Sequence, residues 1–331
     1  MSDSVLSPKV EISEEAYRAL RGGAVIQRRP QCGLLVLRDA DRHDFLHRMT
    51  TNEINGLEVG QSTVTILTSP TARTEQVFTV VCRAEELWLL PATGETEALA
   101  RSLKGKIFFM DAVKVVDDSP AWQRMRLMGP AAGKILATIG IDLLDAADGA
   151  WSEQDGVVAV KQSRFDLPGY EVLAPVAVAE RLSSQMADAG VLAVDKPTYH
   201  LARIEAGRPI PGAELTDSYN PLESGMAWVC ADDKGCYTGQ EIIARQVNYD
   251  KITRTLVGLV SDEALVDEFE VKMGDRNMGA VTSGAYSPDL GKFVALAIIK
   301  RPANEPGTEV AVGGQLATVV PLPFDIEDEM L

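Results

Sequence analysis

The sequence predicts an α+β fold whose C-terminal part is rich in β-strands. Strand-type and helix-type segments are intermixed up to about residue 250. They show no regular strand–helix–strand rhythm and no glycine fingerprint after a strand, which argues against a doubly wound parallel sheet. After Thr255, short apolar segments follow one another at close spacing between turns, a pattern typical of a small barrel or sandwich. The chain has 331 residues, enough for two or three domains of about 150 residues or fewer.

The elements of the first part follow from apolar runs and from helical spacing. A helix is expected over 39–49, because Phe45, Leu46 and Met49 recur on one helical face after an N-capping aspartate. The polar run 117–120 ends in a proline and marks a candidate boundary. The other predicted elements are helices over 14–20 and 95–103, and strands over 34–37, 62–67, 77–82, 87–90 and 113–116.

The second part contains four predicted helices and two predicted strands before the β-rich region begins. Gly190 is expected to close one of these helices. A further boundary is expected near Asp250, where the pattern changes. The helices are predicted over 130–139, 177–189, 199–205 and 240–249. The strands are predicted over 157–160 and 170–173, then over 256–260, 279–283, 293–298, 310–312 and 317–320.

Charge and composition exclude several classes of partner. The chain has 48 acidic and 32 basic residues and a net charge of −16, so we expect no direct nucleic-acid binding and no binding to anionic membranes. No apolar run approaches the roughly 18 residues of a membrane span. The polar, acidic start of the chain resembles neither a secretory signal nor a transit peptide. Four cysteines do not make a disulfide framework in a chain of this length, so we expect a cytoplasmic protein with reduced thiols.

One cysteine lies in a segment of unusual composition. Cys236 is framed by Gly235 and Gly239 and follows Lys234, and an amphipathic helix is expected to begin at Gln240. A neighbouring cation and a helix N-terminus both stabilise a thiolate, so Cys236 is a candidate reactive group with Lys234 as its cationic neighbour. The alternative is a buried, structural cysteine in a tight turn.

Arg203 is a second candidate, near the end of a predicted helix and just before Gly207. Its guanidinium would hold a carboxylate or polarise a heteroaromatic ring, and the alternative is an ion pair at the helix end. His43 and His47 are four residues apart on a predicted helix. No third ligand accompanies them in the sequence, so we expect no metal site.

Taken together, these segments resemble a known family. Residues 234–241 read Lys-Gly-Cys-Tyr-Thr-Gly-Gln-Glu and resemble the signature of the YgfZ-type folate-binding proteins. Those proteins are relatives of the T-protein (aminomethyltransferase) of the glycine cleavage system. Other segments follow in the order of the family along nearly the whole chain: 45–52, 168–171, 203–207, 221–226, 281–288 and 322–324.

The resemblance implies a fold, a ligand and a set of site residues. The fold would be two intertwined α+β domains and a small C-terminal β-barrel around a central folate-binding channel. The domains would span 1–118, 119–250 (with the Cys236 signature) and 251–331. The ligand would be tetrahydrofolate or a derivative. Glu171 would accept hydrogen bonds from the pterin N–H groups and Arg203 would lie beside the pterin, with further contacts from Thr50, Asn52, Tyr237, Gln240 and Arg73. Basic residues would line the path of the anionic glutamate tail, with candidates at Arg28, Arg29, Arg73, Lys234, Arg245 and Lys251.

The sequence also departs from the T-protein pattern. T-proteins carry an aspartate pair on a strand after a glycine-rich turn, and here Gln76 and Val77 occupy those positions. Neither side chain can take a proton or hold a cationic amine as a carboxylate does. Glu75 is one residue away and would point to the opposite face of the strand. The preceding turn reads Pro-Thr-Ala-Arg, where YgfZ-type proteins have Pro-Lys-Gly-Arg, so only Arg73 of the usual cationic pair remains.

The resemblance therefore implies a tetrahydrofolate-binding protein that supports the assembly or repair of iron–sulfur clusters in other enzymes, tRNA-modifying enzymes among them. Cys236 would act as a thiolate toward a sulfur species, an iron or a cluster intermediate. The partners would be folate and iron–sulfur client or assembly proteins, and the chain would be a monomer. Two alternatives stay open. One is a folate-dependent one-carbon transferase of the T-protein type that uses Glu75, and the other is a scaffold that keeps folate only as a structural remnant.

Overall fold

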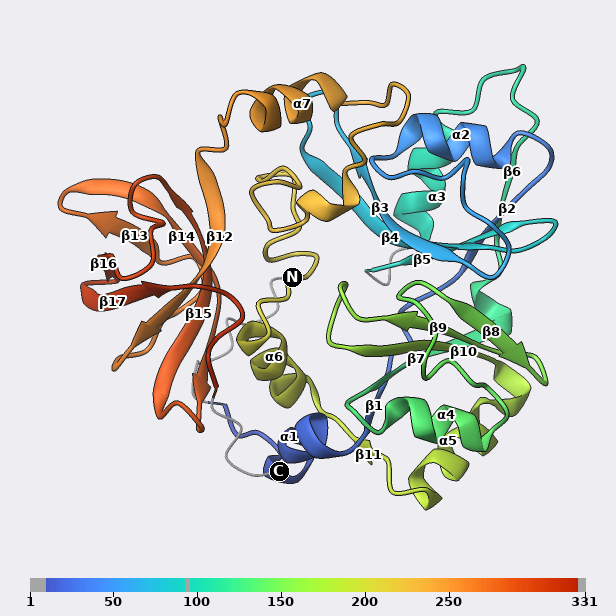
Figure 1. The fold of residues 1–331 in the computed structure, drawn as a ribbon, viewed down its shortest axis with the longest axis horizontal. Coiled ribbons are helices and arrows are strands. Elements are labelled where there is room, and N and C mark those ends of the chain that lie inside the picture. Colours follow the sequence, from blue (N-terminus) through green and yellow to red (C-terminus); the bar gives the residue numbers. More distant parts are fainter. Residues whose placement is uncertain (1–9, 93–95, 327–331) are drawn as a thin grey trace. The chain divides into compact units, whose positions relative to one another are not determined.

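A computed structural model describes residues 10–92 and 96–326 of the chain (Figure 1). Its contacts divide the chain into two compact units. The sheet unit comprises Arg18–Val194 and Trp228–Ala244. The barrel unit comprises the start of the chain up to Tyr17, then Asp195–Ala227 and the part from Arg245 onward. Three short elements belong partly to each unit: α1 (Glu14–Gly22), the 3₁₀ turn η2 (Ala227–Val229) and α7 (Gln240–Asn248).

The first sheet of the sheet unit is antiparallel, with five strands in the order β3-β4-β5-β2-β6. Two helices pack on one of its faces, where Phe45, Leu46 and Leu99 meet Phe78 and Val80 of the strands. The helical spacing of these apolar residues is what places the helices there. The elements are β2 (Leu35–Arg38), α2 (Arg42–Met49), β3 (Ser62–Thr68), β4 (Thr74–Cys82), β5 (Leu87–Pro91), α3 (Thr96–Lys104) and β6 (Lys114–Asp117).

The second sheet of the same unit has six strands in the order β11-β1-β7-β10-β9-β8. Strand β1 precedes the whole first sheet in the sequence, yet it pairs with β7 and β11, so the two sheets are built from interleaved pieces of chain. The elements are β1 (Val25–Arg28), the 3₁₀ turn η1 (Ser119–Ala121), β7 (Trp122–Met128), α4 (Ala132–Thr138), β8 (Trp151–Gln154), β9 (Val157–Gln162), β10 (Gly169–Pro175), α5 (Val176–Asp188) and β11 (Leu192–Ala193).

The two sheets share an apolar layer. Val81, Trp88 and Leu90 of the first sheet form one buried cluster with Val160 and Leu173 of the second. A polar side chain that lies in this layer is removed from water, and it must find its partners within the protein. This requirement governs the candidate site described below.

The barrel unit is built around a closed barrel of six strands in the order β12-β15-β14-β13-β16-β17. Helix α6 (Lys196–Glu205) begins where the side chain of Asp195 accepts a hydrogen bond from the Thr198 amide at 2.8 Å. Its residues Leu201 and Ile204 pack against the barrel. The strands are β12 (Arg254–Ser261), β13 (Glu270–Met273), β14 (Arg276–Ser287), β15 (Lys292–Lys300), β16 (Glu309–Val312) and β17 (Gln315–Val320).

This architecture confirms the predicted α+β fold with a C-terminal β-barrel. Five strands were not expected, namely β1, β7, β8, β11 and β13. Strand β7 carries Arg124 and Arg126 as buried residues, which hides its apolar pattern. Helix α6 begins three residues earlier than expected, because Asp195 caps it and Pro197 suits a first helical turn. The division into three domains stays a prediction, and the start of the helix predicted at residue 95 lies outside the described residues.

None of the helices in the described part of the chain is both long enough and apolar enough to cross a membrane.

Candidate functional site

Cys236 lies on a loop of the sheet unit just before α7. Its side chain is exposed and its thiol is free, which rules out the buried, structural alternative. Cys230, on the same loop, is mostly buried, and burial raises the pKa of its thiol to about 12. Of these two thiols, that of Cys236 is the one exposed to solvent.

Lys234 anchors this loop and does not face solvent. Its ammonium Nζ donates to three main-chain carbonyls at 2.5–2.7 Å, those of His47, Thr50 and Asn52. The side chain is only 7% exposed, and this burial lowers the pKa of Lys234 to about 8. All three donors of the ammonium are used, so Lys234 joins the loop to the segment that follows α2.

Further contacts tie the ends of the loop to the first sheet. The hydroxyl of Thr51 donates to the carbonyl of Val229 at 2.7 Å, and the Ala231 amide donates to the Thr51 carbonyl at 3.0 Å. At the other end, the hydroxyl of Thr68 donates to the carbonyl of Thr238 at 2.5 Å. Hydrogen bonds to the main chain of the loop thus hold it on both sides of Cys236.

Gly239 brings the loop against the turn before β4. Its φ is +86°, and a Cβ there would lie 2.8 Å from the Ser69 carbonyl and 2.9 Å from Cα of Ala72, so only glycine fits. The turn itself is closed by hydrogen bonds between Ser69 and Arg73. The structure therefore places the turn that contains Arg73 beside the end of the loop that contains Cys236. This proximity could not be predicted from the sequence of either segment.

The residues that the resemblance compares with the T-protein carboxylate pair lie in β4. Gln76 pairs with Leu67 of β3, Val77 is buried and Glu75 is exposed. The alternation of the strand therefore turns Glu75 away from the face that Gln76 occupies.

The other predicted folate contacts near the Cys236 loop are either buried or half-buried. Thr50 and Tyr237 are buried, the former with its hydroxyl bonded to the Leu46 carbonyl at 2.9 Å. Burial raises the pKa of Tyr237. Asn52 is half-buried, and its amide donates to Thr63 Oγ1 and the Val64 carbonyl. Gln240 is half-buried at the start of α7.

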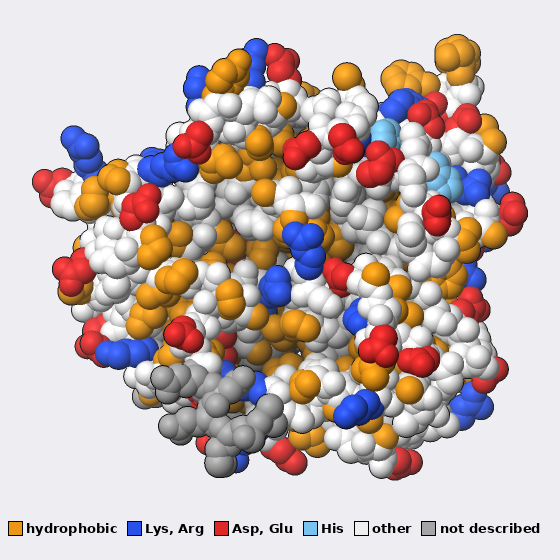
Figure 2. All heavy atoms as spheres, in the orientation of Figure 1, with side chains coloured by type: hydrophobic (Ala, Val, Ile, Leu, Met, Phe, Trp, Pro, Cys, Tyr) orange, Lys and Arg blue, Asp and Glu red, His pale blue; other side chains and the backbone are white. Residues whose placement is uncertain are grey.

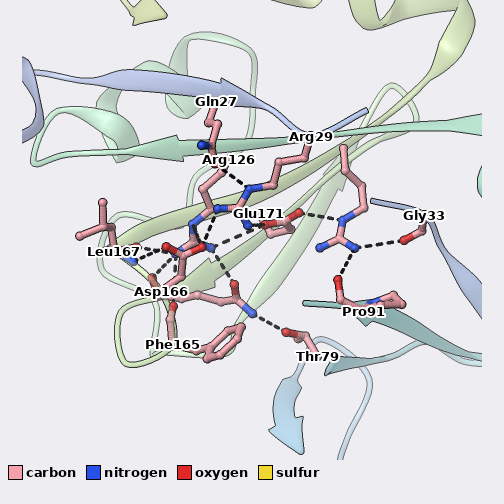
Figure 3. A network of polar contacts seen from close by, with 12 residues as sticks. Gln27, Arg29, Gly33, Thr79, Pro91, Arg126, Phe165, Asp166, Leu167 and Glu171 are labelled. Atoms are coloured by element: carbon pink, nitrogen blue, oxygen red, sulfur yellow. Dashed lines mark hydrogen bonds and ion pairs between the residues drawn. The ribbon is translucent and has the colours of Figure 1, made fainter. Parts of the chain in front are cut away.

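Glu171 lies in β10 within a buried cluster of arginines (Figure 3). Its side chain is 2% exposed, and Oε1 accepts a hydrogen bond from Nε of Arg124 at 2.8 Å. Arg124 is itself fixed by the carbonyls of Gly33 and Pro91. The second oxygen, Oε2, lies 3.5 Å from a guanidinium nitrogen of Arg29. Sequence reasoning missed these partners, because nothing in the sequence pairs β7 with β10.

The cluster continues through Arg126 to a glutamine (Figure 3). Arg126 donates to Gln162 Oε1 and to the Leu167 carbonyl, both at 2.6 Å. Gln162 in turn donates to Thr79 of the first sheet at 2.6 Å. Asp166 pairs with Arg29 at 2.6 Å. Three arginines and two carboxylates therefore share the space, which leaves one net positive charge in an acidic protein.

A cavity of about 250 Å³ opens beside this cluster in the sheet unit. Its wall includes two aromatic residues, Phe165 and Trp228, and the guanidinium of Arg164 lies 4.6 Å from the centre of the Trp228 ring. Asn52 and Gln162 also line it, so the cavity joins the segment held by Lys234 to the arginine cluster. Two cations, Arg164 and Lys161, and one carboxylate, Asp148, also line the cavity, so it offers aromatic faces for a flat ring and a formal excess of one positive charge.

Arg203 belongs to the barrel unit and is fully buried there. It pairs with Glu214 at 3.1 Å and donates to the hydroxyl of Ser283. Burial would raise the pKa of Glu214, but Arg203 and the hydroxyls of Ser283 and Thr282 hold it below its ordinary value. Arg203 lies in the last turn of α6, so the structure contains the ion pair at a helix end that was the alternative interpretation, with Glu214 as its partner. Its contact with folate stays a prediction.

Two family models match this chain. The GCVT N-terminal domain matches residues 11–234, and the glycine cleavage T-protein C-terminal barrel domain matches residues 254–325. The chain belongs to the glycine cleavage T-protein family. The T-protein part of the predicted resemblance is thereby confirmed, while the finer assignment to the YgfZ-type proteins stays a prediction.

Several T-protein relatives align along most of the chain. A putative chloroplastic transferase of Arabidopsis thaliana is 27% identical over 93% of this chain and 72% of its own length. An aminomethyltransferase of Listeria monocytogenes is 27% identical over 93% of this chain and 88% of its own. The crystal structure of aminomethyltransferase T from Bartonella henselae shares the fold, with a TM-score of 0.85 at 20% identity over 94% of this chain and 89% of that one.

The first prediction concerns Lys234, which anchors the loop that carries Cys236. Lys234→Met leaves three buried carbonyls without their donor, so we expect a loss of about 2 kcal/mol or more in the free energy of unfolding. Amide hydrogen exchange over 230–239 should rise at least about tenfold. The matched control is Lys134→Met, on an exposed lysine of α4, which should change neither quantity. Unchanged exchange over 230–239 in Lys234→Met would show that the three hydrogen bonds do not hold the loop.

The second prediction concerns the pH dependence of stability. Burial, and then the charge of Arg203, lowers the pKa of His200 to about 4. Below pH 6.5 the unfolded chain binds a proton at His200 that the folded chain refuses, so the free energy of unfolding falls as the pH falls from about 6.5 to about 4. Linkage gives a loss of roughly 1–2 kcal/mol by pH 5.

Urea unfolding of the wild type and of His200→Gln between pH 7.5 and pH 5 isolates this contribution. The difference in stability between the two proteins should shrink or reverse toward pH 5. Parallel curves across this range would contradict the assignment.

Proposed function

We propose that this T-protein family member binds tetrahydrofolate, or a derivative, in its sheet unit and supports the assembly or repair of iron–sulfur clusters in other enzymes. Its partners would be cytoplasmic iron–sulfur client or assembly proteins, and it would belong to the YgfZ-type branch. The observation that carries this proposal is the exposed thiol of Cys236 on a loop anchored by Lys234. A loop held on both sides presents its thiol at a constant position.

The residues of the cavity fit part of a folate. A pteridine or aminobenzoyl ring is flat, and Phe165 and Trp228 offer flat apolar surfaces. The glutamate tail is anionic, and Arg164 is a cation beside the same cavity. A volume of about 250 Å³ is small for a whole ligand, since such pockets usually measure ~300–1,000 Å³, so this cavity would take one ring system of the folate.

Glu171 would recognise the pterin through the oxygen that Arg124 does not hold. Arg124 fixes Oε1, and Oε2 has only longer contacts, 3.5 Å to Arg29 and 3.9 Å to Arg126. A carboxylate held this way keeps one acceptor oxygen for the paired N–H groups of a pterin. Because the side chain is nearly sealed, binding would require a local opening of the cluster. Arg73, Gln240 and Asn52 stay proposed folate contacts, as does Arg203 in the barrel unit.

Cys236 would supply the thiolate that meets a sulfur species, an iron or a cluster intermediate on the partner. Lys234 would hold the loop in place and would not contact the reacting sulfur, because its ammonium already donates to three main-chain carbonyls. Cys230 would not substitute for Cys236, since burial keeps its thiol protonated.

The third prediction is a pattern of tetrahydrofolate affinities measured by calorimetry. The wild type should bind, and Arg164→Ala should weaken binding on the order of tenfold, because a charge-assisted contact is lost. Glu171→Ala should abolish measurable binding, and Cys236→Ala should leave it unchanged. Arg181→Ala is the matched control, since this exposed arginine lines a separate cavity of about 260 Å³ in the same unit.

Absence of binding by the wild type would remove folate from the account. Equal weakening by Arg164→Ala and Arg181→Ala would move the folate site away from the Trp228 cavity. Loss of binding in Cys236→Ala would mean that the thiol belongs to the folate site and has no separate role.

A folate-dependent aminomethyltransferase is the second candidate function. It is favoured by similarity along most of the chain to proteins named as aminomethyltransferases, such as that of Listeria monocytogenes. The exposed Glu75 is then the carboxylate nearest the expected position. This alternative predicts methylene transfer from a glycine-derived amine to tetrahydrofolate, with loss of transfer in Glu75→Gln.

A further inference from the structure

Three consecutive apolar side chains of the sheet unit are turned toward solvent. Phe108, Phe109 and Met110 are 64%, 97% and 77% exposed, in the segment between α3 and β6. In Figure 1 this segment projects beyond the sheet, and Figure 2 shows hydrophobic side chains at the tip of the same projection. Scattered exposed apolar residues are ordinary, but three adjacent ones at a tip indicate a surface that is covered in use.

The turn that carries them is held in one shape. The Phe108 amide donates to Asp111 Oδ2 at 2.9 Å, and the Asp111 amide donates back to the Phe108 carbonyl at 3.0 Å. Arg48 of α2 fixes the other oxygen of Asp111 at 2.8 Å. A turn that is already ordered loses little conformational entropy when its side chains are buried by a partner.

The segment that carries the tip is basic along the sequence, although Arg101 is paired with Glu97 and the Asp41 carboxylate accepts a hydrogen bond from the Ala112 amide. Residues 101–114 carry Arg101, Lys104, Lys106 and Lys114 against the single Asp111, whereas the whole chain has a net charge of −16. A basic rim around an apolar tip is complementary to an apolar pocket with an acidic rim.

The main chain at the tip distinguishes a protein partner from a lipid bilayer. Within the described residues, the amides and carbonyls of Phe109 and Met110 make no hydrogen bond. Hydrocarbon cannot satisfy them, whereas a protein groove can. A symmetric dimer through this loop would bring two like-charged loops together.

We propose that residues 104–114 form a docking loop that inserts Phe108, Phe109 and Met110 into an acidic-rimmed apolar pocket of a partner protein. Phe109 is the central anchor because it is the most exposed of the three. This inference is independent of folate binding and of the role of Cys236, since it rests on a different surface of the sheet unit.

The test uses the photo-reactive residue p-benzoylphenylalanine in place of Phe109, in cells of the source species. Irradiation should yield one discrete protein adduct. The same probe in place of Val59, another exposed apolar residue of the sheet unit, should yield none. The captured protein is then purified, and its affinity for the wild type and for variants of this chain is measured.

Phe109→Ser should weaken that affinity at least about 30-fold, as expected for a central aromatic anchor. Replacing Lys104, Lys106 and Lys114 together by Glu should weaken it at least about tenfold. Val59→Ser should leave it unchanged. Because Phe109, Val59, Lys104 and Lys114 are exposed and Lys106 is only half-buried, the unfolding midpoints of the variants should match that of the wild type. Adducts only with lipid, adducts only with a second copy, no adduct at all, or an affinity unchanged by Phe109→Ser would each overturn the proposal.

Discussion

One buried ammonium holds together the part of the molecule on which the functional account depends. The sheet unit is made from two separate stretches of chain, and the shorter one, Trp228–Ala244, carries Cys236. Lys234 joins this stretch to the longer one through the carbonyls of His47, Thr50 and Asn52. Without that contact, three carbonyls would be left unpaired in a buried place, and the loop would lose its central attachment.

The anchor also changes how the signature of the loop is understood. A lysine two residues before a cysteine is easily interpreted as a charge that activates the thiol. In the structure its charge is directed into the protein, where burial lowers its pKa to about 8. Lys234 therefore fixes the position of the loop, and in that position the side chain of Cys236 is exposed to solvent. Gly239 has a matching role at the other end, because any larger residue would collide with the turn before β4.

Much of the fold could be predicted from the sequence, because helical spacing and apolar runs are local signals. Strands β1 and β7 could not, since buried arginines interrupt the apolar pattern of β7 and its pairing with β1 is a long-range property. The same limit applied to the site. The sequence singled out Cys236 and Arg203 as candidates, and the family resemblance added Glu171. The partners of Glu171 and Arg203 could not be predicted, because Arg124 and Arg29 approach Glu171, and Glu214 approaches Arg203, only through tertiary structure.

These partners also indicate why the candidate residues are buried. A buried carboxylate is tolerated when a guanidinium and further donors satisfy it, and removal of one partner is then strongly unfavourable. Glu171 and Glu214 both meet this condition, each within its own unit. Cys236 differs from Glu171 and Arg203, since it is exposed and lies outside both clusters.

The most direct test of the central claim compares Cys236 with Glu75 in cells. A strain of the source species that lacks this chain is supplied with the wild type, Cys236→Ala, Cys230→Ala or Glu75→Gln, and the activity of an iron–sulfur enzyme is measured at equal protein levels. The account predicts that the wild type, Cys230→Ala and Glu75→Gln restore the activity and that Cys236→Ala does not. Restoration by Cys236→Ala together with failure of Glu75→Gln would contradict it and would favour the transferase.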